Sequence, residues 1–407
     1  MRSETSPRRK IFGLHPNVFF LGLVSFFTDA SSELTMTILP LFLANVLGVG
    51  PAIIGLIEGV AESTATILKV VSGWLSDRLG RRKPLAVLGY GLSTLAKPFL
   101  YLAGAWPLVL AVRFTDRLGK GIRTSPRDAL VADSSSQADR GKSFGFHRAL
   151  DSLGAVLGLA VAAAIVYQGQ RGALELTRDT YQKLVPVGVV PAVVAVLLLL
   201  LFVREVRGAR KRQEPPEWTA SPPPGPSTAF GGRFKVFLAI TVVFTLGNSS
   251  DAFLILRAQN LGISTFNILL LLVMFNLVNA LVSLPAGLIS DRWGRRVVII
   301  FGWAVYGLIY LGFALVQAPG QVAWLFALYG VYHGAVEGVS RAYVADMVPE
   351  ERRGTAYGLY HGAVGVTALP ASLIAGWLWQ TVDPSAPFFL GAALALLAAV
   401  SLWALVK

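Results

Sequence analysis

The chain of 407 residues contains no cysteine, and it has only four histidines and four methionines. The lack of cysteine excludes disulfides, thiolate metal sites and cysteine nucleophiles. Charge is also scarce, since charged residues make up 14% of the chain, compared with roughly 25% in soluble domains. No Gly-x-x-x-x-Gly-Lys-Ser/Thr loop is present to bind the phosphates of ATP, and the scattered histidines give no Ser/His/Asp arrangement. These absences argue against an enzyme and against ATP as an energy source.

Apolar residues make up 54% of the chain. Apolar runs close to the ~20 residues that cross a bilayer recur along the sequence, and each is expected to be a helix because lipid offers no partner to an exposed backbone amide. The first run is too long for a cleaved signal peptide and has no small-residue cleavage site. The sequence predicts twelve transmembrane helices, at 17–47, 52–76, 84–104, 107–132, 142–168, 184–203, 234–258, 264–289, 297–317, 321–346, 355–381 and 386–406.

The net charge of +13 would suggest nucleic-acid binding in a soluble protein, but its distribution favours a membrane protein. Basic residues gather before the first predicted helix and in every second loop after it, whereas the opposite loops are short and nearly free of them. Because basic residues mark cytosolic loops, we expect a multi-pass protein of the plasma (inner) membrane with both termini in the cytoplasm. The expected partners are the lipid bilayer, a small-molecule substrate and protons, with no nucleic acid, and we expect a monomer.

One segment departs from this pattern. Residues 204–233 begin with a basic run and continue with Pro-rich sequence, including three consecutive prolines at 222–224. Proline prevents helix continuation and favours extended, solvated chain, so this segment indicates a tether between two bundles. The expected domains are a cytosolic N-terminus at 1–16, a six-helix bundle at 17–203, the Pro-rich linker at 204–233 and a second six-helix bundle at 234–407.

One loop sequence occurs in both halves of the chain. Gly-Trp-Leu-Ser-Asp-Arg-Leu-Gly-Arg-Arg at 73–82 is matched by Gly-Leu-Ile-Ser-Asp-Arg-Trp-Gly-Arg-Arg at 287–296. A Val-Ala-Asp sequence ending at Asp133 recurs at Asp346, with the same offset to within one residue. Two motifs that recur at nearly the same offset, about half the length of the chain, indicate that the whole half was duplicated. In a membrane protein, paired halves are typical of a transporter whose pathway lies at the repeat interface.

These motifs resemble the major facilitator superfamily of secondary transporters over essentially the full length of the chain. A third motif, from Arg113 to Gly121, is similar to an arginine-and-glycine motif on the fourth helix, although Asp116 and Arg117 stand where glutamine and glycine are usual. The segment 119–128 is typical of a bacterial subgroup of undefined substrate. The resemblance implies an all-α integral membrane protein of two pseudo-symmetric six-helix bundles, without enzymatic activity. Its signature residues here are Gly73, Asp77, Arg78, Gly80, Arg81 and Arg82, repeated as Gly287, Asp291, Arg292, Gly294 and Arg295.

The residue types of the signature loops suit a conformational lock. Glycine permits a tight reverse turn, and an aspartate can face a helix N-terminus, where unpaired amides favour an anion. In the superfamily the matching aspartate locks the cytosolic side against the opposite half. Carried over to this chain, the implied contacts are Asp77 near Gly354, Asp291 near Gly141, and Asp133 and Asp346 with the loop arginines.

Charged residues inside the predicted helices are candidates for proton coupling, because each costs about 2.5–3.5 kcal/mol at a helix centre. Acids four residues apart occur in the first and second helices, and basic residues follow the same face of the fourth. An acid beside an arginine has a proton affinity that a conformational change alters. The same set would also suit a structural ion-pair lattice. The residues concerned are Asp29, Glu33, Glu58, Glu62, Arg113, Asp116 and Arg117.

The predicted substrate cavity also takes residues from the fifth helix and from the second half. We expect these side chains to hydrogen-bond substrate, or to form a second ion-pair gate around Arg341. The spacing of His333 and Glu337 would also suit half of a metal site, although the few histidines and methionines argue against a soft-metal pathway. The residues are His147, Asp151, Asn248, Asp251, His333, Glu337 and Arg341.

The sequence therefore predicts a secondary transporter that works by alternating access. We favour proton-coupled efflux of a small organic molecule, with the proton gradient as energy source and no cofactor. One alternative is proton-coupled import of an organic anion, bound by the face that carries Arg113, Arg117 and Lys120. Further alternatives are a metal-ion exporter, and a membrane sensor or lipid-handling protein on the same fold.

Overall fold

The computed structural model describes residues 11–135, 140–170, 173–206, 231–348 and 353–406. Within these residues the chain is helical and contains no strand. The N-terminal half consists of α1 (Pro16–Thr35), α2 (Leu39–Leu41), η1 (Phe42–Val46), α3 (Pro51–Leu79), α4 (Lys83–Ala96), η2 (Lys97–Leu102), α5 (Trp106–Asp133), α6 (Arg140–Gln170) and α7 (Arg178–Leu201). The C-terminal half consists of α8 (Gly232–Gly247), α9 (Ala252–Asn260), α10 (Thr265–Trp293), α11 (Arg295–Leu315), α12 (Pro319–Asp346), α13 (Arg353–Thr381) and α14 (Ala386–Leu405).

These helices form twelve spans over the described residues, which confirms the predicted fold class. The first span comprises α1, α2 and η1, the third comprises α4 and η2, and the seventh comprises α8 and α9. The largest shift in a boundary is at α7, which begins at Arg178 rather than near 184. There the side chain of Thr177 accepts a hydrogen bond from the amide of Thr180 and caps the helix.

Nine of the described helical segments are long and apolar enough to cross a membrane by length and composition. The three long helices outside that set are α3, α5 and α12. Each of the three carries several of the charged residues that the sequence analysis placed inside predicted helices. Charge is therefore concentrated in a few helices, which favours their packing inside the molecule rather than against lipid.

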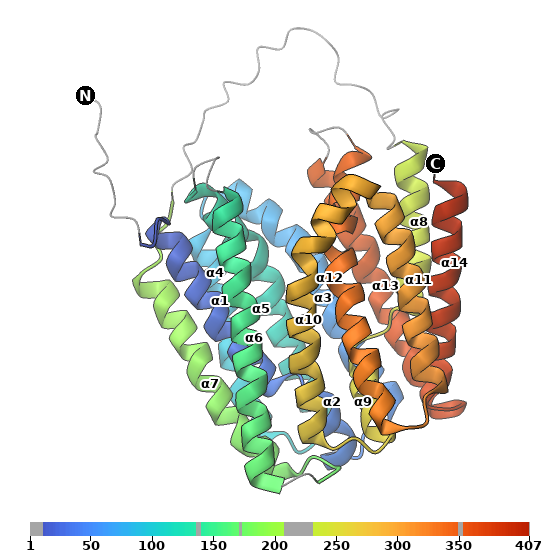
Figure 1. Cartoon of the computed structure of the whole chain (residues 1–407). Helices are drawn as coiled ribbons and strands as arrows, with labels where there is room; N and C mark the ends of the chain where they lie inside the picture. The colour runs from blue at the N-terminus through green and yellow to red at the C-terminus, as the bar shows by residue number, and fades with distance from the viewer. Residues whose placement is uncertain (1–10, 136–139, 171–172, 207–230, 349–352, 407) are drawn as a thin grey trace, which may run out of the picture.

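The two halves form separate bundles that lie side by side (Figure 1). The start of α1 and the end of α14 lie at the same end of the molecule, which we name the termini end. The opposite end, near α2 and α9, we name the far end. Within the N-terminal bundle α1 packs on α6 and α7, and across the two bundles α3 packs on α13 and α6 on α10. These two helix pairs form most of the interface between the bundles, and α9 adds contacts to α2 and α3.

Backbone contact between α3 and α13 is closest at the far end. A Cβ atom on Gly55 would lie 2.3 Å from the carbonyl oxygen of Ser372, and one on Gly376 would lie 2.5 Å from a carbonyl oxygen of α3. Nearer the termini end the approach is less close, because a Cβ on Gly358 would meet only a side-chain carbon of Val70, at 3.9 Å. We name this glycine-lined contact the α3–α13 seam. Only glycine leaves room for backbones this close.

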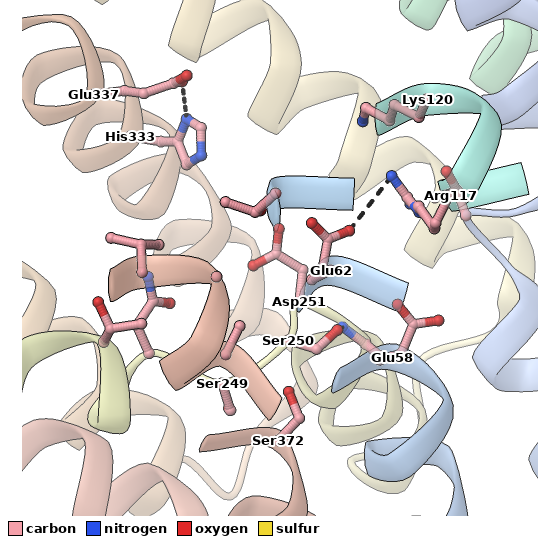
Figure 2. Close-up of a pocket in the computed structure, with 18 of the residues that line it drawn as sticks. Glu58, Glu62, Arg117, Lys120, Ser249, Ser250, Asp251, His333, Glu337 and Ser372 are labelled. Carbon is pink, nitrogen blue, oxygen red and sulfur yellow. Dashed lines mark hydrogen bonds and ion pairs between the residues drawn. The ribbon is translucent and has the colours of Figure 1, made fainter. Parts of the chain in front are cut away.

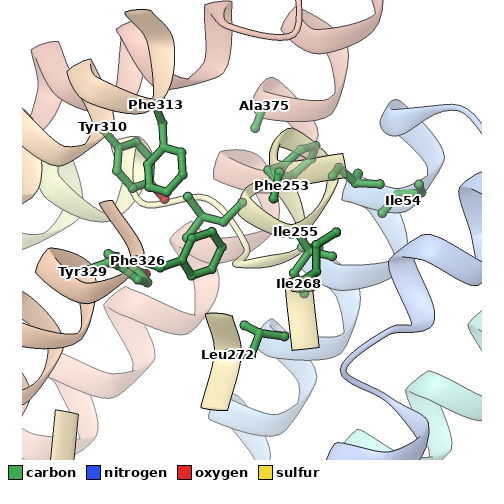
Figure 3. Close-up of a cluster of buried hydrophobic side chains, with 14 of the residues drawn as sticks. Ile54, Phe253, Ile255, Ile268, Leu272, Tyr310, Phe313, Phe326, Tyr329 and Ala375 are labelled. Atoms are coloured by element: carbon green, nitrogen blue, oxygen red, sulfur yellow. The ribbon is translucent and has the colours of Figure 1, made fainter. Parts of the chain in front are cut away.

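Apolar side chains from both bundles extend the closure at the far end. Ile54 of α3 belongs to the same buried cluster as Phe253 and Ile255 of α9 and Ile268 of α10. Figure 3 shows part of this cluster, with residues from the two bundles brought together. The carbonyl oxygen of Leu174, in the loop before α7, also accepts hydrogen bonds from side chains of the C-terminal half. The bundles are therefore joined at the far end by packing and by hydrogen bonds.

Candidate substrate cavity

A cavity of about 770 Å³ lies between the two bundles, on the termini side of the α3–α13 seam. It extends from Ser372 at the seam to Lys69 and His361 nearer the termini end. Side chains of α1, α3 and α5 form one wall, and side chains of α8 to α13 form the other. Its lining includes the predicted residues Asp29, Glu33, Glu58, Glu62, Arg113, Asp116, Arg117, Asn248, Asp251, His333, Glu337 and Arg341.

The first and seventh spans are broken where they reach the cavity. The α-helix of the first span stops at Thr35 and resumes at Leu39, and that of the seventh stops at Gly247 and resumes at Ala252. Met36 and Thr37 of the first break and residues 248–251 of the second line the cavity. The side-chain oxygen of Asn248 accepts a hydrogen bond of 3.1 Å from Tyr306. Irregular backbone at membrane depth is tolerated where it lines a cavity. The corresponding positions of the two breaks fit the internal repeat of the chain.

Two ion pairs connect α3 to α5 in the N-terminal wall. Arg113 contacts Glu58 at 2.7 Å and this pair is buried, whereas Arg117 contacts the half-exposed Glu62 at 3.4 Å (Figure 2). Both helices run from the far end to the termini end, so the four-residue spacing of the acids matches the four-residue spacing of the arginines. The predicted match between acids and arginines is thus present for two of the four acids.

Several other charges of this wall have no oppositely charged partner. Among the described residues, neither Asp29 nor Glu33 forms an ion pair with a basic side chain, although Glu33 accepts a hydrogen bond from Thr37. Lys69 and Lys120 likewise form no ion pair within the described part of the chain. The N-terminal wall therefore presents both unpaired acids and unpaired amines to the cavity.

The C-terminal wall combines one carboxylate with aromatic rings. Asp251 accepts a hydrogen bond of 2.7 Å from the hydroxyl of Tyr329. The ring of Tyr329 stacks on Phe275 with centroids 5.3 Å apart and on Tyr332 with centroids 5.8 Å apart. Trp303 stacks on a further phenylalanine and also lines the cavity. These rings give the wall an apolar surface beside Asp251.

Glu337 lies among the remaining charged groups of the C-terminal wall. It contacts Arg341 of the same helix, and it lies 3.5 Å from the ring nitrogen of His333. Arg148 of the opposite bundle approaches it to 3.9 Å. Arg341 and Glu337 are therefore in contact, and Glu337 also forms an inter-bundle pair with Arg148, while the gate around Arg341 stays a prediction. Among the described residues, no group of three or more His, Cys, Asp or Glu side chains is placed to hold a metal ion.

The sequence model of the Major Facilitator Superfamily matches residues 21–256 and 236–407. An uncharacterized MFS-type transporter of Methanocaldococcus jannaschii is 36% identical over 403 residues, covering 96% of this chain and 94% of that protein. The chain belongs to the Major Facilitator Superfamily. It is therefore an MFS transporter and a multi-pass membrane protein, as the sequence motifs predicted.

Other similarities are weaker. A multi-drug resistance efflux pump PmrA homolog of Lactococcus lactis is 25% identical over 388 residues, covering 91% of each chain. Among solved structures, the nucleoside transporter NupG superposes with a TM-score of 0.74 at 14% identity, covering 96% of this chain and 99% of that chain. The xylose transporter XylE from E. coli, in a partially occluded inward open conformation, gives 0.71 at 19% identity, with coverage of 96% and 97%. These structural likenesses concern the MFS fold.

The signature loops of this MFS transporter contain two of the ion pairs that the superfamily resemblance implies. Arg82 contacts Asp133 at 2.8 Å, and Arg295 contacts Asp346 at 2.5 Å. Gly80 and Gly294 have φ angles of 61° and 90°, which explains glycine at both turns. The structure does not describe the side chains of Asp77 and Asp291, or those at the starts of α6 and α13 near Gly141 and Gly354, so their predicted contacts stay predictions.

Two residues that we predicted in the substrate cavity are not among its lining residues. Asp151 accepts a hydrogen bond from Ser25 of α1 and lies 3.7 Å from Arg148. His147 is one turn earlier on α6 and is buried. Because α6 packs closely on α1 within the N-terminal bundle, this face of α6 points into the bundle instead of toward the other half. Asp151 therefore adjoins the candidate coupling acid Asp29 instead of lining the cavity.

Sequence reasoning missed one buried amine, Lys97 at the junction of α4 and η2. Its Nζ donates hydrogen bonds to the hydroxyls of Ser31 at 2.6 Å and Ser32 at 3.1 Å. The residue is 1% exposed and forms no ion pair among the described residues. The rule that intramembrane charges mark functional sites would have selected it, because it lies inside the predicted span 84–104. It couples α4 to the polar face of α1 that also carries Glu33.

Proposed function

We propose that this MFS transporter exports a small organic molecule by alternating access and is driven by the proton gradient. The observation that carries the proposal is a cavity between the two bundles that contains carboxylates and is closed at the far end. Closure at one end with a cavity toward the other is the arrangement expected of one state of an alternating-access cycle. The distribution of basic loop residues supports placing the termini end in the cytosol and the protein in the plasma membrane.

Protons are the favoured coupling ion because the cavity holds acids without a basic partner. Asp29 and Glu33 belong to α1, next to the break of the first span. Glu62 is partnered by Arg117 at 3.4 Å, and its side chain is 45% exposed. A movement that changes the distance between Glu62 and Arg117 would change the proton affinity of the carboxylate. The transporter needs no cofactor in this scheme, and a single chain contains the whole pathway.

Export is the favoured direction because the chain is similar over most of its length to a multi-drug resistance efflux pump homolog. One observation favours a second function, the uptake of an organic anion. Lys69 and Lys120 line the cavity without a carboxylate partner among the described residues, and Arg117 lies on the same face of α5 as Lys120. An anion bound there would meet three basic side chains.

Proton coupling is tested with purified protein in liposomes under an imposed pH gradient. We expect Asp29→Asn and Glu62→Gln to lose gradient-driven solute movement and the accompanying proton flux, which a pH-sensitive dye reports. Solute exchange without a gradient should persist, because the variants retain the cavity. Asp179→Asn, an exposed acid at the start of α7, is the matched control and should behave as the unaltered protein.

Two outcomes would contradict coupling through these acids. The first is unchanged gradient-driven movement in both variants. The second is loss of folded protein from the membrane, which is recovered when Arg117 is removed together with Glu62. That second pattern would support a structural ion pair in place of proton coupling.

A further inference from the structure

The break in the seventh span places a carboxylate in the cavity. Asp251 directly precedes α9, yet its side chain makes no capping hydrogen bond to the amides of that helix. One carboxylate oxygen accepts the hydroxyl of Tyr329, and Asp251 forms no ion pair among the described residues. The side chain is exposed, so an oxygen is accessible to a bound molecule.

Carboxylates of the opposite bundle approach the same space. Glu58 and Glu62 of α3 are electrostatic neighbours of Asp251, and Figure 2 shows Glu62 beside it. Glu58 is 3% exposed, and its Oε1 atom has no hydrogen-bond partner among the described residues, because only Oε2 contacts Arg113. A buried oxygen without a partner costs free energy unless a bound group satisfies it. Donor groups of a ligand would therefore find acceptors on both walls.

A row of aromatic side chains, which we name the aromatic row, lies next to Asp251. Phe275, Tyr329 and Tyr332 follow one another with the stacked geometry given above, and His333 meets Phe275 edge to face with centroids 5.6 Å apart. Aromatic faces attract a flat ring by stacking and a cation by their quadrupole. The cavity volume of about 770 Å³ lies within the usual range for small-molecule sites, roughly 300–1,000 Å³.

From this geometry we propose that the cavity binds an organic cation that carries an aromatic ring, with its protonated amine on Asp251 and its ring against the aromatic row. The proposal rests on the proposed function and names the substrate class of that same site. The unpaired Lys69 and Lys120 do not oppose it, because they lie nearer the termini end than Glu62 and Arg117, by one to two turns of α3 and α5. The amine thus binds at the deep end of the cavity, where acids of both bundles meet.

The experiment compares indole compounds of similar size that differ in charge. Tryptamine is a cation, tryptophol is neutral, tryptophan is a zwitterion and indole-3-acetate is an anion. Binding to the purified protein in detergent is measured by thermal stabilisation, which increases with ligand affinity. We expect tryptamine to bind about tenfold or more tightly than tryptophol and indole-3-acetate, because a charge-assisted contact is worth at least that factor. Hexylamine, a cation without a ring, should bind more weakly than tryptamine.

Variants locate the site of the cation. Asp251→Asn should reduce tryptamine binding to the level of tryptophol, while Asp383→Asn, an exposed acid between α13 and α14, should leave it unchanged. Tyr329→Phe keeps the ring and frees the carboxylate oxygen of Asp251 that accepts the tyrosine hydroxyl. Tryptamine binding should therefore be retained or tightened. This second variant decides the question if Asp251→Asn does not fold.

Four results would overturn the proposal: preference for indole-3-acetate, absence of tryptamine binding at millimolar concentration, a cation preference that survives in Asp251→Asn, and loss of binding in Tyr329→Phe. The liposome measurement separates these failures from failure of the proposed function. If a neutral or anionic solute moves in response to the gradient, the proposed transport function stands and the cation site is refuted. If tryptamine binding depends on Asp251 but no solute moves in response to the gradient, the cation site stands and proton-coupled export is refuted.

Discussion

Replacement of Arg113 by leucine is expected to lower the free energy of unfolding by about 3–5 kcal/mol, the loss that follows when one partner of a buried ion pair is removed. The side chains of Arg113 and Glu58 are 7% and 4% exposed, so water screens this pair very little. Arg113→Leu leaves the Glu58 carboxylate buried without its counter-charge. Thermal and denaturant unfolding of the purified protein in detergent would measure the loss.

A second variant distinguishes the ion pair from the space that Arg113 fills. The double variant Arg113→Leu with Glu58→Leu should recover most of the lost stability, because no unpaired charge remains in the bundle. Arg233→Leu, an exposed arginine in the first turn of α8, is the control and should unfold as the unaltered protein does. A double variant as unstable as the single one would show that the charge pairing is not the cause. A stable double variant that no longer transports would assign the pair a part in the cycle.

Gly55→Leu is expected to abolish transport while the protein still folds within each bundle. A Cβ atom at this position would lie 2.3 Å from the carbonyl oxygen of Ser372, and backbone atoms cannot move aside as a flexible side chain can. The larger residue therefore forces α3 and α13 apart at the far end and prevents the state with a closed seam. Transport by reconstituted protein and the state of the seam are the two measurements.

The natural absence of cysteine makes the seam directly measurable. A Cβ on Gly50 would lie 3.1 Å from the end of the Gln380 side chain, so a short bifunctional thiol reagent should cross-link Gly50→Cys with Gln380→Cys in the closed state. Adding Gly55→Leu should strongly reduce the yield of that cross-link. Gly91→Leu in α4 is the matched control, since a Cβ there meets nothing within 4 Å. Equal cross-link yields and retained transport in Gly55→Leu would contradict the proposed closure.

The sequence predicted the spans well, because hydrocarbon thickness fixes the length of an apolar helix. It did not predict where two of them break. The polar residues at 248–251 were recognised, but polarity alone does not distinguish a continuous helix with polar side chains from an interrupted one. The first span contains a proline at position 40, which is compatible with either. Tertiary packing around the cavity decides between these outcomes.

The site was predicted as a set of residues, and the partners within the set needed the structure. Equal spacing on α3 and α5 suggested pairing of acids with arginines, yet which acid meets which arginine depends on how the two helices are rotated. The same information was missing for α6, whose His147 and Asp151 face α1. Lys97 escaped notice because it has no charged neighbour at helical spacing. Its partners are hydroxyls from a distant part of the chain.

The two places where the bundles meet differ in their response to ionic strength. The α3–α13 seam is formed by backbone and small side chains, which dissolved ions do not screen. On the termini side the bundles are joined by Arg148 and Glu337, whose side chains are 64% and 42% exposed. The Debye length falls from about 8 Å at physiological salt to about 3 Å at 1 M, so added salt weakens that contact selectively. Salt concentration thus becomes a one-sided control of the conformational equilibrium, because it acts on the Arg148–Glu337 contact and leaves the seam unaffected.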